Sequence, residues 1–183
     1  MLMPILCLTN GDIGMLKNGF TLIELIVVIC ILGILSIVAV PKFIDTSNDA
    51  LLAQLDSMEA NIQSATYRVY AKAVLQDKLS GSKSVIVDGD SVLTHSGYPI
   101  GDWDTALRHV LDLSAQPFST SICTSTWCGN GNSQNLPGGI STTTGRGAKI
   151  TPQGYAYTQV CGVYYMNHND GSKPQIGVLT SGC

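Results

Sequence analysis

Residues 20–40 form a continuous apolar stretch that contains a single charged side chain, Glu24. As an α-helix, a stretch of this length would span roughly 30 Å at ~1.5 Å per residue, which matches the hydrocarbon core of a bilayer. A carboxylate in such surroundings is costly, so it usually marks a function and has a partner. The stretch therefore predicts an apolar helix over residues 20–41, able to span a membrane, with one acid that has a specific role.

Gly19 and Phe20 stand before this stretch and are typical of a processing site. A Sec-type signal peptide has a shorter apolar core and is cut after it, whereas a cut between Gly19 and Phe20 leaves the apolar residues in the mature protein. Residues 1–19 are therefore predicted to be a leader. Lys17 and Lys42 flank the stretch, and the positive-inside rule gives only a weak preference for an external C-terminal domain.

Residues 1–14 are unusual for a leader because they are apolar, contain Asp12 and lack basic side chains. Residues 15–19 alone would make a short polar leader, and codons for Gly11 and Asp12 can contain a ribosome-binding sequence upstream of Met15. We therefore expect translation to start at Met15. A leader of all 19 residues is the alternative, and the mature protein is the same in both cases.

The composition bounds the rest of the chain. Its 183 residues, 45% of them hydrophobic, suffice for one modest globular domain and a membrane segment. Thirteen acidic residues face 10 basic ones, for a net charge of -3, so a basic surface for specific nucleic-acid binding is not expected. Gly, Ser, Thr and Asn are frequent in the second half, which suits a secreted β-rich domain over residues 80–183.

Residues 42–79 are predicted to form an amphipathic helix that packs under a sheet and ends near residues 76–79. Apolar side chains recur at steps of three and four, which is the helical period; they are Leu51, Leu55, Met58, Ile62, Ala65 and Val69. The opposite face carries Asp49, Asp56, Glu59, Gln63 and Lys78. A coiled coil is the alternative, but the run is short and lacks paired flanking charges. Gly33 and Pro41 are predicted weak points of the preceding helical stretch.

Local signals predict the elements of the globular domain. Residues 84–87 and 91–94 indicate a β-hairpin about Asp88-Gly89, a favoured two-residue turn. Residues 102–113 indicate a short helix with an acidic cap. Residues 129–146 are predicted to be an exposed loop or a weakly ordered edge. Residues 160–167 and 175–180 indicate a second hairpin.

Six cysteines divide by position. Cys7 lies in the predicted leader, and Cys30 lies in the apolar stretch. The other four are Cys123, Cys128, Cys161 and Cys183, and an even number in an exported domain predicts disulfides. Because the second hairpin places Cys161 opposite Cys183, that pair and Cys123–Cys128 are our first choice, although four cysteines allow three pairings. A bridge of the longer span should stabilise by roughly 3 kcal/mol in the loop-entropy description.

No pattern in the chain predicts catalysis, and we expect neither an enzyme, a cofactor nor a metal site. The histidines are isolated in sequence and no nucleophile motif accompanies them; they are His95, His109 and His168. Zinc binding by Cys123, Cys128 and His168 lacks a finger spacing, so disulfides are favoured.

Two binding alternatives are also weak. Residues 167–171 lack the acidic alternation and the distal glutamate of a calcium loop, and a plain turn is favoured. A set of aromatic residues could stack on sugars, but core or subunit-interface packing is favoured; they are Trp103, Trp127, Tyr155 and Tyr157.

Gly19, Phe20, Glu24 and the apolar stretch together resemble the N-terminal signal of type IV pilins. The resemblance implies an α+β fold in which a long N-terminal helix packs on an antiparallel sheet with a disulfide-closed C-terminal region. It implies a prepilin peptidase that cuts after Gly19 and methylates Phe20. It further implies that Glu24 pairs with the terminal amine of a neighbouring subunit, and physically a buried carboxylate and a buried ammonium each need the other. The alternative is an ordinary single-span anchor with a stray glutamate.

Further motifs resemble the mannose-sensitive haemagglutinin (MSHA) pilins of marine gamma-proteobacteria. They comprise residues 41–43, 62–65, 69–73 and 97–99 and the two-cysteine ending, and the pair Cys123/Cys128 departs from that pattern. The implied function is that of a major pilus subunit in surface attachment and twitching-type motility. Its implied partners are identical subunits, the inner membrane, the pilus assembly machinery and surface glycans, and the filament is extracellular. The alternatives are a pseudopilin of a type II secretion system, a minor pilin, and a membrane-anchored binding or enzymatic domain.

Overall fold

The computed structural model describes residues 20–111, 113, 116–117 and 122–183, without the side chains of residues 37–46 and 116–117. The predicted leader, including Gly19, lies outside these residues. The chain divides into two compact units, Met1–Asp45 and Thr46–Cys183, which are described separately. The limits predicted between residues 41 and 42 and between residues 79 and 80 stay predictions.

The first unit consists, where it is described, of the beginning of helix α1 (Leu22–Leu75). Its apolar side chains are open to solvent in the isolated chain; among them Leu22 is 80% exposed and Ile23 67% exposed. The backbone is helical through Gly33 and Pro41, so neither predicted weak point ends the helix.

Where the structure is described, no helix proves long and apolar enough to cross a membrane. The predicted span over residues 20–41 extends into residues 37–46, whose side chains lie outside the described part. That span stays a prediction.

In the second unit, α1 buries the predicted apolar stripe. Leu55, Ile62 and Val69 are fully buried, and Met58 and Ala65 are nearly so. They pack with residues of the sheets in one hydrophobic cluster, which confirms core packing over a coiled coil. The helix ends at Leu75, one residue before the predicted region.

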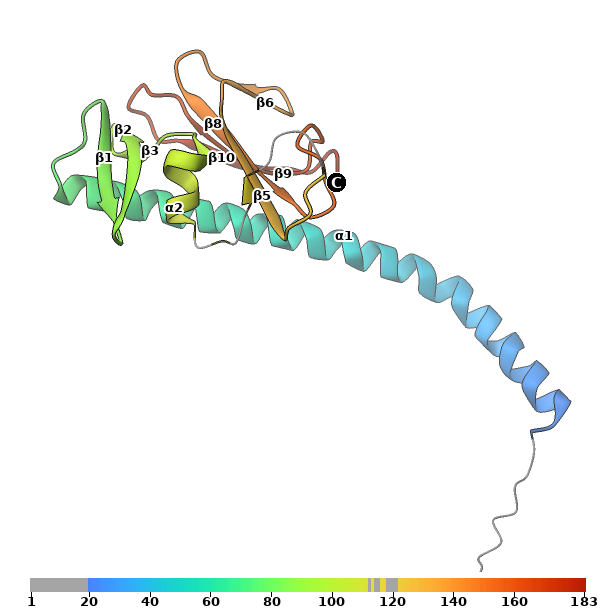
Figure 1. Cartoon of the computed structure of the whole chain (residues 1–183). Helices are drawn as coiled ribbons and strands as arrows, with labels where there is room; N and C mark the ends of the chain where they lie inside the picture. The colour runs from blue at the N-terminus through green and yellow to red at the C-terminus, as the bar shows by residue number, and fades with distance from the viewer. Residues whose placement is uncertain (1–19, 112, 114–115, 118–121) are drawn as a thin grey trace, which may run out of the picture. The chain divides into compact units, whose positions relative to one another are not determined.

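Two sheets lie on the same side of this part of α1 (Figure 1). The smaller has the order β1-β2-β3, with β1 (Ser82–Val87), β2 (Asp90–His95) and β3 (Tyr98–Pro99). The larger has the order β10-β9-β8-β5-β4. Its strands are β4 (Gln116–Pro117), β5 (Trp127–Ser133), β8 (Arg146–Pro152), β9 (Gly162–Asn167) and β10 (Gln175–Leu179). All pairs are antiparallel except β4 with β5.

The remaining elements are short. They are the π-helical turn η1 (Trp103–Leu107), helix α2 (Arg108–Val110), and the strand pair β6 (Asn135–Leu136) and β7 (Ile140–Ser141). The chain therefore has the α+β fold that the resemblance to type IV pilins implies: a long helix followed by antiparallel sheets, with two disulfides.

Both predicted hairpins are confirmed. In the first, Asp88 and Gly89 both have positive φ, 52° and 102°, as the favoured two-residue turn requires. The second joins β9 and β10 in an antiparallel pair. In each case the turn residues and the flanking β-prone runs specify the same structure.

The prediction of an exposed loop or weakly ordered edge over residues 129–146 is wrong at its start, where residues 129–133 belong to β5, whereas residues 137–139 and 142–145 lie outside strands. Gly129 and Gly131 lie in β5, which pairs with β8 inside the larger sheet. A Cβ on Gly129 would lie 2.2 Å from the indole ring of Trp103, and one on Gly131 would lie 2.4 Å from the backbone nitrogen of Trp103. The glycines therefore make room for η1 against the strand. The helix predicted over residues 102–113 is shorter than expected, although Asp102 caps it by accepting a hydrogen bond from the Thr105 N–H (2.8 Å).

The free edge of β1 is closed by side chains that follow α1. Gln76 donates a hydrogen bond to the Ile86 carbonyl (2.8 Å) and accepts one from the Ile86 N–H (3.1 Å). Lys78 donates to the Ser84 carbonyl (2.6 Å). The amide of Gln76 thus takes the place of a neighbouring peptide group.

Candidate functional site

The start of α1 is a capping box built by Thr21 and Glu24. The Thr21 hydroxyl accepts a hydrogen bond from the Glu24 N–H (3.3 Å), and a Glu24 carboxylate oxygen accepts from the Thr21 N–H (3.2 Å) and hydroxyl (3.1 Å). Leu25 N–H donates the first helical bond, to the Thr21 carbonyl (3.2 Å). The reciprocal bonds satisfy donors that a helix start leaves unpaired, and they place a negative charge at the positive end of the helix dipole.

This geometry assigns Thr21 a role that the sequence reasoning missed. The pattern Thr-x-x-Glu before an apolar run is the sequence signature of a capping box, and it was present at residues 21–24. The carboxylate uses one oxygen, Oε2, for both bonds from Thr21. Within the described residues, the other oxygen accepts no hydrogen bond, so it is available to a cation from outside the helix.

The residues around the capping box are apolar and uncovered in the isolated chain. Phe20 is 80% exposed, like Leu22 on the first turn. The structure therefore brings Phe20, Thr21 and Glu24 together at one helix end. Gly33 lies further along α1 with open space around it, and Pro41, whose side chain is outside the described part, lies later still.

The second candidate region is the disulfide-closed end of the chain. Cys161 and Cys183 are bonded with their Cα atoms 4.9 Å apart, and Cys123 and Cys128 with theirs 5.7 Å apart. These are the pairs expected from the sequence. Because Cys123 and Cys128 are bonded to each other, neither thiolate can serve as a zinc ligand. In the part of the chain that is described, no group of three or more metal-ligating side chains forms.

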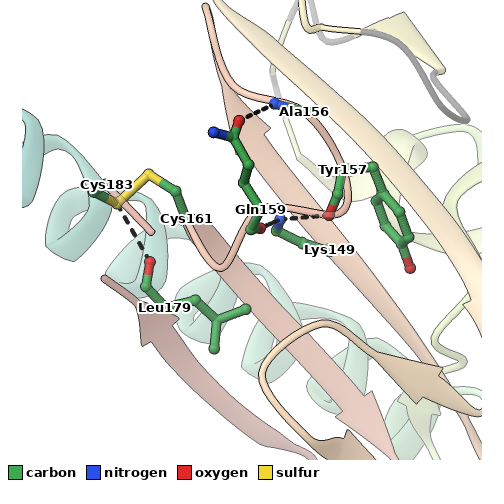
Figure 2. Close-up of a disulfide and its surroundings, with 7 residues drawn as sticks. All are labelled: Lys149, Ala156, Tyr157, Gln159, Cys161, Leu179 and Cys183. Carbon is green, nitrogen blue, oxygen red and sulfur yellow. Dashed lines mark hydrogen bonds between the residues drawn. A yellow bond between two sulfur atoms is a disulfide. The ribbon is translucent and has the colours of Figure 1, made fainter. Parts of the chain in front are cut away.

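Lys149 is a buried amine beside the Cys161–Cys183 disulfide (Figure 2). It lies on β8 with no exposed surface. Its Nζ donates hydrogen bonds to the backbone carbonyls of Tyr157 (2.8 Å) and Gln159, and it lies 5.5 Å from the centre of the Tyr157 ring. Burial lowers the pKa of Lys149 to about 8.

The stability of the protein is expected to rise with pH because of Lys149. Its pKa is about 8 in the folded chain and about 10.4 in an unfolded one, so the unfolded state binds more protons between these values and unfolding becomes harder as pH rises. The expected gain is ~2 kcal/mol between about pH 8 and about pH 10. Burial raises the pKa of Tyr98, Tyr157 and Tyr165, so toward pH 10 the unfolded phenols ionise first and these groups oppose the gain from Lys149.

Chemical denaturation at several pH values measures this gain. A Lys149→Met variant serves as the control, and its stability should be flat over the same window apart from changes shared with the original chain. The same rise in both proteins would contradict the assignment to Lys149.

The aromatic residues considered for sugar binding belong mainly to the core. Trp103 is 3% exposed. Trp127 and Tyr155 are partly buried against the main hydrophobic cluster, and Tyr157 packs on a second cluster that includes Tyr164 and Met166 of β9. Of the histidines, His168 contacts a neighbouring segment: its Nδ1 lies 3.1 Å from the Thr142 hydroxyl.

Comparison with known proteins agrees with the N-terminal geometry. Residues 14–40 match the family model described as the prokaryotic N-terminal methylation motif. The chain is 47% identical over 64 residues to the type IV narrow pilus major component PilA5 of Thermus thermophilus. That alignment covers 35% of this chain and 52% of the relative, so the chain spans about half the length of the relative it matches. No solved structure matched significantly.

Proposed function

We propose that this chain is a subunit of a type IV pilus filament. The observation that carries the proposal is the match of residues 14–40 to the methylation motif, at a helix whose first turn holds Glu24 and whose apolar side chains are uncovered. The similarity to a pilus major component and the α+β fold with two disulfides support it.

In this proposal the apolar start of α1 forms the filament core. Exposed apolar side chains gain free energy when identical helices bury them, at about 25 cal/mol per Å². Hydrophobic contact is non-directional, so it does not define the axial position of an incoming subunit. Pairing of Glu24 with the terminal amine of a neighbour supplies that register, because either charge left alone in an apolar core is costly.

The earlier steps are proposed from the same motif. A prepilin peptidase in the inner membrane cuts between Gly19 and Phe20 and methylates the new terminus at Phe20. The precursor resides in the inner membrane until the assembly machinery adds it to the extracellular filament. Surface attachment, glycan binding and motility are proposed roles, and the narrower MSHA assignment rests on the sequence resemblance alone, since neither comparison names that subgroup.

The intact mass of the protein in a sheared cell-surface fraction tests the proposal. We expect the mass of residues 20–183 with one added methyl group and both disulfides closed. A processed protein found only in the envelope, never in the sheared fraction, would contradict the filament and favour a pseudopilin. An uncleaved mass in the envelope would favour an anchored domain.

A further inference from the structure

Lys149 is an unusual feature of the domain because its amine is buried without a carboxylate. Among the described residues no acidic side chain lies within ion-pair distance of it. Its cross-strand neighbour on β9 is Tyr164, and its acceptors are two backbone carbonyls. Burying a charge without a charged partner is costly, so its hydrogen bonds must offset the desolvation.

The two carbonyls belong to the segment that leads directly into the disulfide. Tyr157 and Gln159 lie two positions apart, shortly before Cys161. Figure 2 shows the amine reaching both carbonyls from β8. The carbonyl of Val160, the residue before Cys161, accepts a hydrogen bond from the N–H of Gly182, the residue before Cys183 (2.9 Å). Both halves of the disulfide are therefore held by contacts on their neighbouring residues.

The amine links this segment to β8 through two hydrogen bonds. Within the segment, the Ala156 N–H donates to the Gln159 side-chain oxygen (2.6 Å) and the Gln159 N–H donates to the Ala156 carbonyl (3.1 Å). Loss of the amine would remove the hydrogen bonds that these two carbonyls accept at a partly buried site. An unsatisfied buried acceptor is costly, so the segment would regain partners by moving toward water.

We propose that Lys149 is a positioning residue for the Cys161–Cys183 disulfide. By holding residues 157–161 on β8, its amine keeps Cys161 beside Cys183 when the bond is reduced. This raises the effective concentration of one thiol at the other, and the bond becomes harder to reduce. The inference concerns the domain alone and does not depend on the proposed filament.

Redox titration of the full chain in detergent tests the proposal, with dithiothreitol and its cyclic disulfide as the couple. Each reduction takes two electrons and two protons from one dithiothreitol, which closes to its ring disulfide, and leaves two cysteine thiols. Alkylation and peptide mass analysis report the two bonds separately. In Lys149→Met, the equilibrium constant for reducing Cys161–Cys183 should rise by about 10-fold, or ~30 mV, while Cys123–Cys128 stays within about twofold.

Lys149→Gln is the conservative variant, because its amide retains two N–H donors, and it should shift the constant by less than Lys149→Met. A parallel shift of both disulfides would show general loosening of the domain and overturn the proposal. An unchanged Cys161–Cys183 constant in Lys149→Met would overturn it as well.

A measurement on the unaltered chain keeps the proposal testable if the variants do not fold. Coupling is reciprocal, so reduction of Cys161–Cys183 should expose Lys149 and raise its acetylation rate by an amine-reactive ester at least about 10-fold. Lys83 and Lys173, both exposed, should react at unchanged rates. Equal protection of Lys149 in the reduced and oxidised chains would refute the link.

Discussion

Glu24→Ala is expected to leave export and processing intact and to reduce surface filaments to less than about a tenth of the normal amount. The substitution removes the carboxylate that would neutralise a neighbour's terminal amine, and an unpaired buried charge costs ~3–5 kcal/mol. Such a penalty applies at every subunit added, so its effect on a polymer of identical subunits is large. The ratio of sheared to cell-retained protein, with the mass of each pool, measures the result.

Thr21→Ala separates the two roles of Glu24. It removes the hydroxyl that takes part in the capping box and keeps the carboxylate, so it should cost helix stability of only ~1 kcal/mol. Filaments should then remain far more abundant than in Glu24→Ala. Normal filament yield from Glu24→Ala would refute the pairing role, and equal loss in both variants would assign the defect to the cap.

Gly129→Ala is expected to destabilise the globular domain by at least about 3 kcal/mol, the upper end of typical overpacking costs. The added Cβ would meet three ring atoms of Trp103 at 2.2–2.3 Å. Trp103 is buried between the strand and the core, so the ring has little room to move. Thermal or denaturant unfolding of the full chain in detergent measures the loss.

A second substitution identifies the cause. In a Trp103→Leu background the smaller side chain should make Gly129→Ala much less costly, a coupling that a double-mutant cycle quantifies. Gly33→Ala is the control without a clash, because a Cβ there meets nothing within 4 Å, and it should be neutral or stabilise the helix by up to ~1 kcal/mol. Additive effects of Gly129→Ala and Trp103→Leu would contradict the proposed clash.

Elements specified by neighbouring residues were predictable from the sequence. The Asp88-Gly89 turn fixes the first hairpin because both residues adopt the positive φ that this turn requires. The stripe from Leu55 to Val69 has the helical period and faces the core. The second hairpin brings Cys161 to Cys183, so local pattern also indicated a long-range covalent bond.

Features that depend on distant partners were not predictable. Gly129 lies in a segment whose composition is typical of a loop. A strand residue without a side chain is favourable there only because the Trp103 ring packs against it. From the sequence, Lys149 would be expected to be a solvent-exposed charge. No sequence pattern shows that its amine binds the carbonyls of residues 8 and 10 positions later. Thr21 is a different case: its capping signature was visible in the sequence, but Glu24 was interpreted only in terms of another subunit.

The closed edge of β1 bears on how copies of this chain can meet. An uncovered strand edge can pair with strands of other molecules, which leads to aggregation. This hazard grows with the concentration of the protein. Gln76 and Lys78 occupy the peptide groups of Ile86 and Ser84, so a foreign strand must first displace them. The helix whose apolar start we propose for ordered association is thus followed directly by two residues that hinder disordered association.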